Sequence, residues 1–292
     1  MNIGFIGYGE AAYNITLGFS QNGIHGIRAN DAMMDHPVMG VQVHARAEEA
    51  GVELVSDAKE VARWADVLIA AVPSSFTMDV CNTVKSELRP GQIYADVSAS
   101  TPATKIAIWE QIKDTGVYFA DAAMLGSLPQ DKHRVPITVS GNGAEKFKEA
   151  MEPLGMRITL AGDKAGAASA IKLVRSIFMK GIATLMIETM QAADAYDVTD
   201  EIIASIGKSM DGIPFAQHLD RLVIGSALHA KRRAAEMKGS IAMLEEEKLS
   251  SEMTTATKHR LEDLIPYNFA EKYVGGKPKS FSEIIEAIRP EK

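Results

Sequence analysis

Three small residues near the N-terminus could bind a pyrophosphate. Gly7, Gly9 and Ala12 form a G-x-G-x-x-A pattern between the apolar segment Ile3–Ile6 and a helical pattern. At such a junction the first glycine permits a tight turn, and the second lets the backbone approach a phosphate at a helix N-terminus, where N–H groups attract anions. The small Ala12 allows the helix to pack closely on the strand. This context predicts a dinucleotide site, with a merely structural turn as the alternative.

An acidic residue at the end of the second predicted strand bears on the choice of dinucleotide. Asp31 directly follows Ile27–Asn30. A carboxylate at this place can accept hydrogen bonds from the adenosine ribose hydroxyls and repels a 2′-phosphate. The next basic side chain, Arg46, is too far along the chain to be assigned to a phosphate. The sequence therefore favours NAD over NADP, and a solvated turn carboxylate is the other interpretation of Asp31.

Two later strand ends offer contacts to the nicotinamide half and to a substrate. The buried strand pattern Asp66–Val72 ends at Pro73, and ligands bind beyond the carboxyl ends of parallel strands. We therefore expect Val72 and Pro73 to contact the nicotinamide half. The strand pattern Gln92–Asp96 leads into a hydroxyl-rich turn, which can also cap the helix that follows. Within this turn Ser98 lies closest to the strand end and is the better candidate for substrate binding.

The longest helical pattern carries polar groups on one face. Lys164–Tyr196 is largely apolar and contains no proline, and it would span about 45 Å at 1.5 Å per residue. Lys172, Ser176 and Lys180 stand four residues apart and so share a face. Because most other faces are apolar, we expect this helix to be buried on most faces and to connect two domains. For Lys172 the alternative interpretation is a lysine that extends from a buried helix to the surface.

The elements that would position these residues alternate between strand and helix over the first half of the chain. Such alternation predicts an α/β fold with a doubly wound sheet. The chain after Tyr196 is helical in pattern. We expect a Rossmann dinucleotide-binding domain at 1–163, followed by an all-α C-terminal domain at 164–292 for substrate binding and dimerisation. Other predicted segments are a loop at Asp121–Ser127 and helices at Phe215–Lys238, with a break near Gly225, and at Ile241–Leu261.

The totals of the sequence argue against several classes of protein. A net charge of −7 disfavours a general nucleic-acid binder. One cysteine, Cys81, excludes an intrachain disulfide and fits a reducing compartment. The histidines show no metal-ligand spacing, so no metal site is expected. The longest apolar run of the first half, Val67–Val72, is too short to span a membrane, and no signal sequence precedes the first strand. We expect a cytoplasmic protein.

Taken together, these separated motifs resemble the β-hydroxyacid dehydrogenase superfamily, which includes 3-hydroxyisobutyrate, tartronate-semialdehyde and 6-phosphogluconate dehydrogenases. The chain looks closest to the 6-phosphogluconate-dehydrogenase-like NAD-binding branch. Besides the glycine motif, the family's Asp-x-Ser-Thr loop matches at Asp96–Ser98, with Ala99 in place of the threonine. Its Ser-Gly-Gly loop falls on Leu125–Ser127 without the first serine, and its lysine segment falls on Lys172, with Ser176 in place of an asparagine.

The resemblance implies an NAD(P)-dependent oxidoreductase that acts on a small β-hydroxy acid or the corresponding oxo acid. Lys172 would be the general acid and base and Ser176 its partner, while Ser98 and Gly126 would bind the acid end of the substrate. A neutral lysine base needs its pKa lowered from about 10.4 to about 7–8, on the order of 4 kcal/mol, which burial in a cleft can supply. The departures at Leu125 and Ser176 argue against 6-phosphogluconate itself.

Other functions remain open on the same residues. An oxidative decarboxylase would release carbon dioxide together with the reduced cofactor. A C=N reductase fits the scaffold, although imine-reducing relatives usually lack the lysine. A sensor that binds NAD without chemistry is the non-enzymatic alternative. The apolar C-terminal helices predict a homodimer formed mainly through residues after Gly166.

Overall fold

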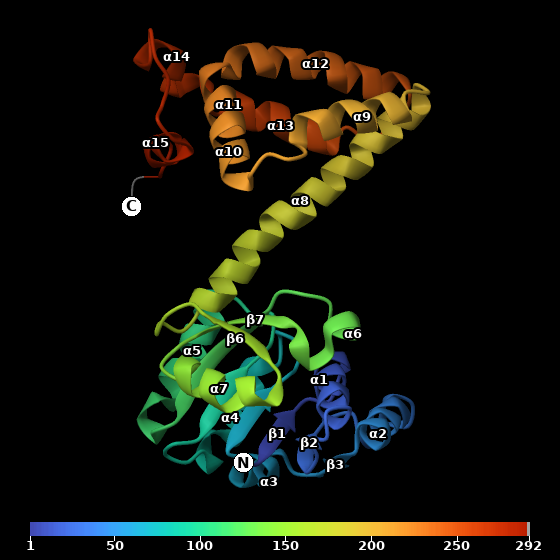
Figure 1. The fold of residues 1–292 in the computed structure, drawn as a ribbon, viewed down its shortest axis with the longest axis vertical. Helices are drawn as coiled ribbons and strands as arrows, with labels where there is room; N and C mark the ends of the chain where they lie inside the picture. The colour runs from blue at the N-terminus through green and yellow to red at the C-terminus, as the bar shows by residue number, and fades with distance from the viewer. Residues whose placement is uncertain (291–292) are drawn as a thin grey trace. The chain divides into compact units, whose positions relative to one another are not determined.

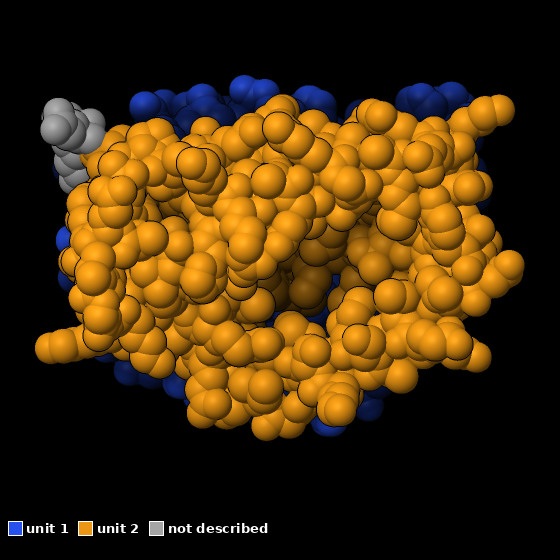
Figure 2. Space-filling model, turned by 90° about the horizontal axis from the view of Figure 1, so that it is seen from above, with its two compact units in different colours: residues 1–177 blue, residues 178–292 orange. Residues whose placement is uncertain are grey.

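The computed structural model describes residues 1–290 and divides into two compact units, Met1–Ile177 and Phe178–Lys292. Figure 2 distinguishes the two units by colour. The division falls inside the long helix α8 (Ala167–Ala195), so the first turns of α8 belong to unit 1. The sequence pattern instead places the whole helix in the second domain, starting at 164. The cofactor and substrate roles assigned to the two domains stay predictions.

Unit 1 is built on one eight-stranded sheet. Its strands are β1 (Ile3–Ile6), β2 (Ile27–Asn30), β3 (Val52–Leu54), β4 (Val67–Ala70), β5 (Ile93–Asp96), β6 (Tyr118–Met124), β7 (Pro136–Ser140) and β8 (Arg157–Leu160), in the order β3-β2-β1-β4-β5-β6-β7-β8. All neighbours are parallel except β6 and β7. Because β2 and β4 lie on opposite sides of β1, the strand order reverses there, at the place where doubly wound sheets bind ligands. The predicted Rossmann-like α/β fold is confirmed.

Helices cover both faces of this sheet (Figure 1). They are α1 (Glu10–Ser20), α2 (Met39–Ala50), α3 (Ala58–Trp64), α4 (Thr77–Val84), α5 (Pro102–Ile112), α6 (Leu128–Asp131) and α7 (Ala144–Met151). Side chains alternate between the faces, as strand geometry requires. Phe5 of β1 packs in one core with α1, α2 and α7, while the adjacent Ile6 packs in the other core with α3, α4 and α5. Both faces of β1, β4 and β5 are therefore buried, which explains their continuous apolar sequences.

Strand β6 is longer than the sequence indicates. Asp121–Met124, predicted as part of a loop, continues the strand and pairs antiparallel with β7, from Asp121 opposite Ser140 to Met124 opposite Ile137. The prediction was wrong here because two consecutive alanines give no alternating pattern. The extension places Asp121 beside Asp96 of β5.

Unit 2 is helical. After α8 it contains α9 (Thr199–Met210), α10 (Phe215–Leu219), a π-helical segment (Asp220–Ile224), α11 (Gly225–Leu228), α12 (Ala230–Glu246), α13 (Glu252–Glu262), α14 (Phe269–Lys272) and α15 (Phe281–Ala287). The helical chain passes through Gly225 and breaks at His229 instead. The predicted single helix Ile241–Leu261 is wrong, because the chain turns between Glu246 and Glu252, where Lys248 has φ +56°.

The central part of α8 is exposed, against the expectation of burial on most faces. Val174 is 65% exposed, Ile177 76% and Ile187 60%. Helical periodicity identifies an apolar face, but it does not say whether the same chain supplies the surface that covers it. Among residues 1–290 no helix has the length and apolar character needed to cross a membrane.

Candidate functional site

The predicted dinucleotide residues come together around one cavity of unit 1. This cavity, of about 500 Å³, lies at the carboxyl ends of β1, β2 and β4. It is lined by five of the six predicted cofactor residues: Gly7, Gly9, Asp31, Val72 and Pro73. The sixth, Ala12, is fully buried in the core that α1 shares with the sheet, which fits the packing role predicted for it. Their contacts to a cofactor stay a prediction.

The glycine turn has the shape that a pyrophosphate requires. Gly7 has φ +87°, and a Cβ there would lie 2.5 Å from Val72 Cγ1 and 2.6 Å from the Ala71 oxygen. Only glycine accepts both conditions. A Cβ on Gly9 would meet no protein atom within 4 Å. Gly9 is also the N-cap of α1, and no side chain caps the first N–H groups of that helix. The empty space at Gly9 therefore lies next to free N–H donors that can bind a phosphate.

Asp31 is held at the rim of this cavity by backbone donors. Its carboxylate accepts the N–H of Tyr8 at 2.6 Å and the N–H of Met33 at 2.8 Å. Because a carboxylate has about four lone-pair positions, it can still accept hydrogen bonds from a ribose. Asp31 therefore places a fixed negative charge at the rim, beside the glycine turn.

Sequence reasoning missed other residues of this cavity. Arg46 of α2 lines it, with its guanidinium 5.5 Å from the ring centre of Tyr13. Met33, Met39 and Phe76 also line it and are about half exposed. Arg46 is 15 residues after Asp31 in the sequence, which suggested that it lies far from the cofactor site. Helix α2, which follows β2, nevertheless brings Arg46 to the same cavity as Asp31. Exposed apolar side chains at a cavity favour a flat, apolar ligand group.

The predicted substrate residue Ser98 lies beyond β5 and is buried. Its N–H donates to Asp96 Oδ1 at 2.8 Å, and its hydroxyl lies 2.6 Å from the hydroxyl of Ser100. The ammonium of Lys105, which is fully buried, lies 3.4 Å from Ser98 Oγ. Lys105 is absent from every motif used to predict the site. Only the buried face of α5 could have indicated it.

Gly126 follows β6 and has little room for a side chain. A Cβ there would lie 2.9 Å from Pro136 Cδ and 3.0 Å from Asp131 Oδ2. The residue itself is exposed. The exposed Gly126 backbone therefore remains accessible to a ligand, as a substrate loop requires.

Lys172 and Ser176 lie one turn apart near the start of α8, and both are partly exposed. Ser169, one turn before Lys172, is buried and donates its hydroxyl to Asp121 at 2.7 Å. Asp121 in turn lies 3.5 Å from the ammonium of Lys105. One polar network therefore includes Ser98 and the first turn of the helix that carries Lys172. The catalytic roles of Lys172 and Ser176 stay predictions.

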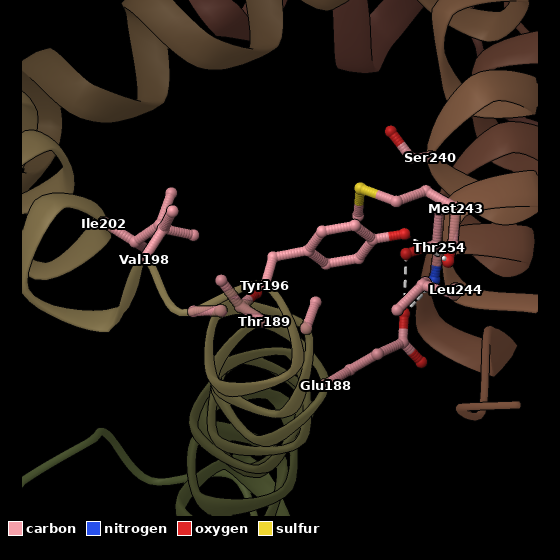
Figure 3. A pocket seen from close by; sticks show the side chains of 11 residues that line it. Glu188, Thr189, Tyr196, Val198, Ile202, Ser240, Met243, Leu244 and Thr254 are labelled. Atoms are coloured by element: carbon pink, nitrogen blue, oxygen red, sulfur yellow. Dashed lines mark hydrogen bonds between the residues drawn. The ribbon is translucent and has the colours of Figure 1, made fainter. Parts of the chain in front are cut away.

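A second cavity, of about 260 Å³, lies within unit 2 (Figure 3). Tyr196 extends across it towards Met243, and its hydroxyl donates to the Met243 oxygen at 3.2 Å. Glu188 is buried at its edge, where it accepts N–H bonds from Met253 and Thr254 and the hydroxyl of Thr254. Burial raises the pKa of Glu188, but these hydrogen bonds outweigh it and lower the pKa overall. The carboxylate thereby caps α13, which is a structural task.

Comparison with known proteins agrees with this arrangement. Residues 2–100 match the family described as "NADP oxidoreductase coenzyme F420-dependent", and residues 193–264 match "Domain of unknown function (DUF1932)". The solved structure of the conserved protein MTH1747, described as structurally similar to 3-hydroxyacid dehydrogenases, is 27% identical with a TM-score of 0.61, covering 90% of this chain and 96% of that one. These matches support the predicted resemblance to the β-hydroxyacid dehydrogenase superfamily.

Another relative and a structural neighbour of this chain are named for different reactions. The glyoxylate/succinic semialdehyde reductase 2 of Arabidopsis thaliana is 24% identical over 83% of this chain and 69% of its own. The structure of a Myxococcus stipitatus imine reductase variant with NAD⁺ has a TM-score of 0.75 at 16% identity, covering 99% of both chains. At that identity the likeness shows the fold alone. The Arabidopsis relative and the Myxococcus neighbour are both named as reductases, and residues 2–100 of this chain match an NADP oxidoreductase family.

Proposed function

We propose that this protein is an NAD-dependent dehydrogenase that transfers a hydride between the nicotinamide and a small β-hydroxy acid or its oxo acid. The observation that carries the proposal is the cavity at the glycine turn, because five predicted cofactor residues line it and the backbone at Gly9 leaves room for a pyrophosphate. The hydroxyacid dehydrogenase likeness of a 27% identical structure supports the same class.

The cofactor half of the site would hold NAD through the backbone and one carboxylate. Bound NAD supplies the hydride acceptor. The backbone at Gly7 and Gly9 would bind the pyrophosphate, and Asp31 would accept the hydroxyls of the adenosine ribose. Val72 and Pro73, at the end of β4, would contact the nicotinamide half. The negative charge of Asp31 favours NAD, while Arg46 on the same rim is the residue through which NADP could still be accepted.

The substrate half would move one proton. Lys172, when neutral, would accept the hydroxyl proton of the substrate, and Ser176 would hold the lysine or the substrate oxygen by a hydrogen bond. Ser98 and the Gly126 backbone would bind the acid end. In the reductive direction the protonated Lys172 would donate to the carbonyl oxygen. The Arabidopsis relative named as a reductase of glyoxylate and succinic semialdehyde makes that direction a reasonable first assay.

Activity with a panel of compounds tests the proposal and separates its rivals. We expect reduction of NAD by short β-hydroxy acids, and oxidation of NADH by their oxo acids. Carbon dioxide release in step with NADH would indicate an oxidative decarboxylase. Turnover of cyclic imines alone would indicate a C=N reductase, which the fold of the imine reductase neighbours allows. Cofactor binding with no turnover of any compound would indicate a sensor and overturn the proposal.

We further propose a homodimer formed through the C-terminal helices, in the cytoplasm. The support is the exposed apolar surface of α8, which includes Val174, Ile177 and Ile187. Monomeric proteins rarely leave such a row of large apolar side chains in contact with water. A second copy of this chain would remove it from solvent.

A further inference from the structure

Three buried charged groups lie between the sheet and α8, and the proposed reaction gives none of them a proton or a hydride to move. Lys105, Asp96 and Asp121 are each 0% exposed. The Lys105 ammonium lies 3.0 Å from Asp96 Oδ1 and 3.5 Å from Asp121 Oδ1. Burial of charges costs more free energy than an apolar core of the same shape. Stability alone therefore does not explain why these three charged side chains are buried together.

Lys105 separates two carboxylates that the sheet brings together. Asp96, the last residue of β5, and Asp121, in the middle of β6, are direct register partners on two parallel strands. Like charges placed opposite each other on neighbouring strands repel. The ammonium of α5 between them offsets that repulsion and fixes both carboxylates in one orientation.

The Asp96 side of the cluster orients Ser98. The Lys105 ammonium donates to the main-chain carbonyl oxygen of Asp96 at 2.8 Å and lies 3.4 Å from Ser98 Oγ. Asp96 Oδ1 accepts the N–H of Ser98, and Asp96 Oδ2 accepts the hydroxyl of Thr77 at 2.6 Å. Asp96 thus fixes the backbone of Ser98, while the Ser98 hydroxyl contacts both the Lys105 ammonium and the hydroxyl of Ser100.

The Asp121 side of the cluster holds the first turn of α8. Asp121 accepts the Ser169 hydroxyl at 2.7 Å and the Ser169 N–H at 3.0 Å. Ser140 donates to Asp121 at 3.3 Å and accepts the N–H of Ala168 at 2.9 Å. An anion at this place satisfies free N–H groups and the positive end of the helix dipole. Lys172 follows Ser169 by one helical turn.

We infer that Lys105 is a positioning residue, which couples the Ser98 loop to the start of α8 and so sets where Lys172 stands relative to the substrate. The inference rests on the proposed function for the role of Lys172. Removing the ammonium would leave two buried carboxylates in opposition, and the strand ends and the helix start would separate. Displacement of a catalytic group by about 1 Å costs roughly 10²-fold in rate.

Hydrogen exchange by mass spectrometry, combined with steady-state kinetics, tests the coupling. In Lys105→Met we expect exchange to rise about tenfold at residues 98–100 and at residues 168–170 together, because Asp96 and Asp121, which accept N–H groups of the two segments, lose the ammonium that orients them. We expect kcat to fall roughly 10²-fold, with an unchanged Kd for NAD. In Asp121→Asn we expect faster exchange at 168–170 alone. The double variant Lys105→Met/Asp121→Asn should regain part of kcat, since one carboxylate is then neutral.

Lys113→Met is the matched control, because Lys113 is an exposed lysine just after α5. It should leave both exchange and kcat unchanged. A folded Lys105→Met protein with wild-type exchange at either segment would overturn the coupling. If Lys105→Met does not fold, Asp121→Asn decides: selective exchange at 168–170 with reduced kcat supports the inference, and wild-type behaviour overturns it. Hydrogen exchange can be measured without catalysis. If the wild-type protein turned over no substrate, the proposed function would be refuted, but the exchange data would still test whether Lys105 couples the Ser98 loop to the start of α8.

Discussion

Asp31 is the single residue on which the choice of cofactor depends. Its carboxylate is fixed by the N–H groups of Tyr8 and Met33 at the rim of the cavity. We predict that Asp31→Asn weakens NAD binding about tenfold, because hydrogen bonds to a charged group are the stronger ones. NADP binding should weaken less or improve. Cofactor titration by fluorescence measures both.

The control for this substitution is Asp35→Asn, an exposed aspartate of the same loop that does not line the cavity. It should bind both cofactors as the wild type does. Equal NAD affinity in Asp31→Asn and Asp35→Asn would remove Asp31 from the cofactor site.

His133 makes the stability of unit 1 depend on pH. The ring is buried, and within the described residues neither ring nitrogen has a hydrogen-bond partner. Burial, helped by Arg134 and Lys132, lowers the pKa of His133. The unfolded chain therefore takes up a proton first, below about pH 6.5, and stability falls as pH drops through that range, by at most about 1.4 kcal/mol per pH unit.

We predict that His133→Leu flattens this acid-side loss, as measured by denaturant unfolding between pH 7 and pH 5. His25→Leu, which changes an exposed histidine of the same unit, should keep the wild-type slope. An unchanged slope in His133→Leu would show that another group titrates there.

Local spacing was enough to predict some of the site residues and not others. Gly7, Gly9 and Asp31 could be placed from sequence because a strand, a turn and a helix follow each other directly along the chain. Arg46 and Lys105 could not, because each reaches its place only after a helix has returned to the sheet. Their position depends on packing and not on neighbouring residues.

At the scale of elements, the start of α13 depends on a distant carboxylate. Glu188 of α8 accepts the N–H groups of Met253 and Thr254. We predict that Glu188→Gln lowers the free energy of unfolding of unit 2 by about 1–3 kcal/mol, because buried donors lose a charged acceptor. Since the pKa of Glu188 is lowered, its contribution is present above about pH 4.3 and is lost as the pH falls further.

Thermal melts of Glu188→Gln and Glu252→Gln compare this cap with an exposed glutamate in the first turn of the same helix. Only Glu188→Gln should have a lower melting temperature than the wild type. Identical melting temperatures in the two variants would contradict the capping role of Glu188. The same contact explains the wrong prediction of one helix over Ile241–Leu261. The turn after α12 is stabilised by a residue more than sixty positions earlier, so no local pattern announces it.

At the scale of the whole molecule, the sequence predicted a Rossmann-like sheet followed by helices, and the fold has both. The alternation of buried strands with helices was sufficient for that. The exposure of α8 could not be predicted from the sequence. An apolar helix face has the same sequence pattern whether the same chain or a second copy covers it.

The exposed face of α8 gives the oligomer prediction. We predict that Ile177→Glu, at a residue 76% exposed in the single chain, converts a dimer into a monomer in analytical ultracentrifugation. A buried charge at an interface without a partner is strongly unfavourable. Val274→Glu, at an apolar residue outside α8 that is 84% exposed, should leave the dimer intact. A wild-type monomer, or a dimer in Ile177→Glu, would contradict this.

The central claim is that the amine of Lys172 moves the substrate proton beside a nicotinamide. Pre-steady-state NADH formation, with the best hydroxy acid of the panel, tests it in Lys172→Ala against Lys164→Ala, an exposed lysine just before α8. We predict that Lys172→Ala slows hydride transfer by about 10²- to 10⁴-fold with an unchanged Kd for NAD, and that Lys164→Ala reacts like the wild type. A near-normal rate in Lys172→Ala would contradict the account.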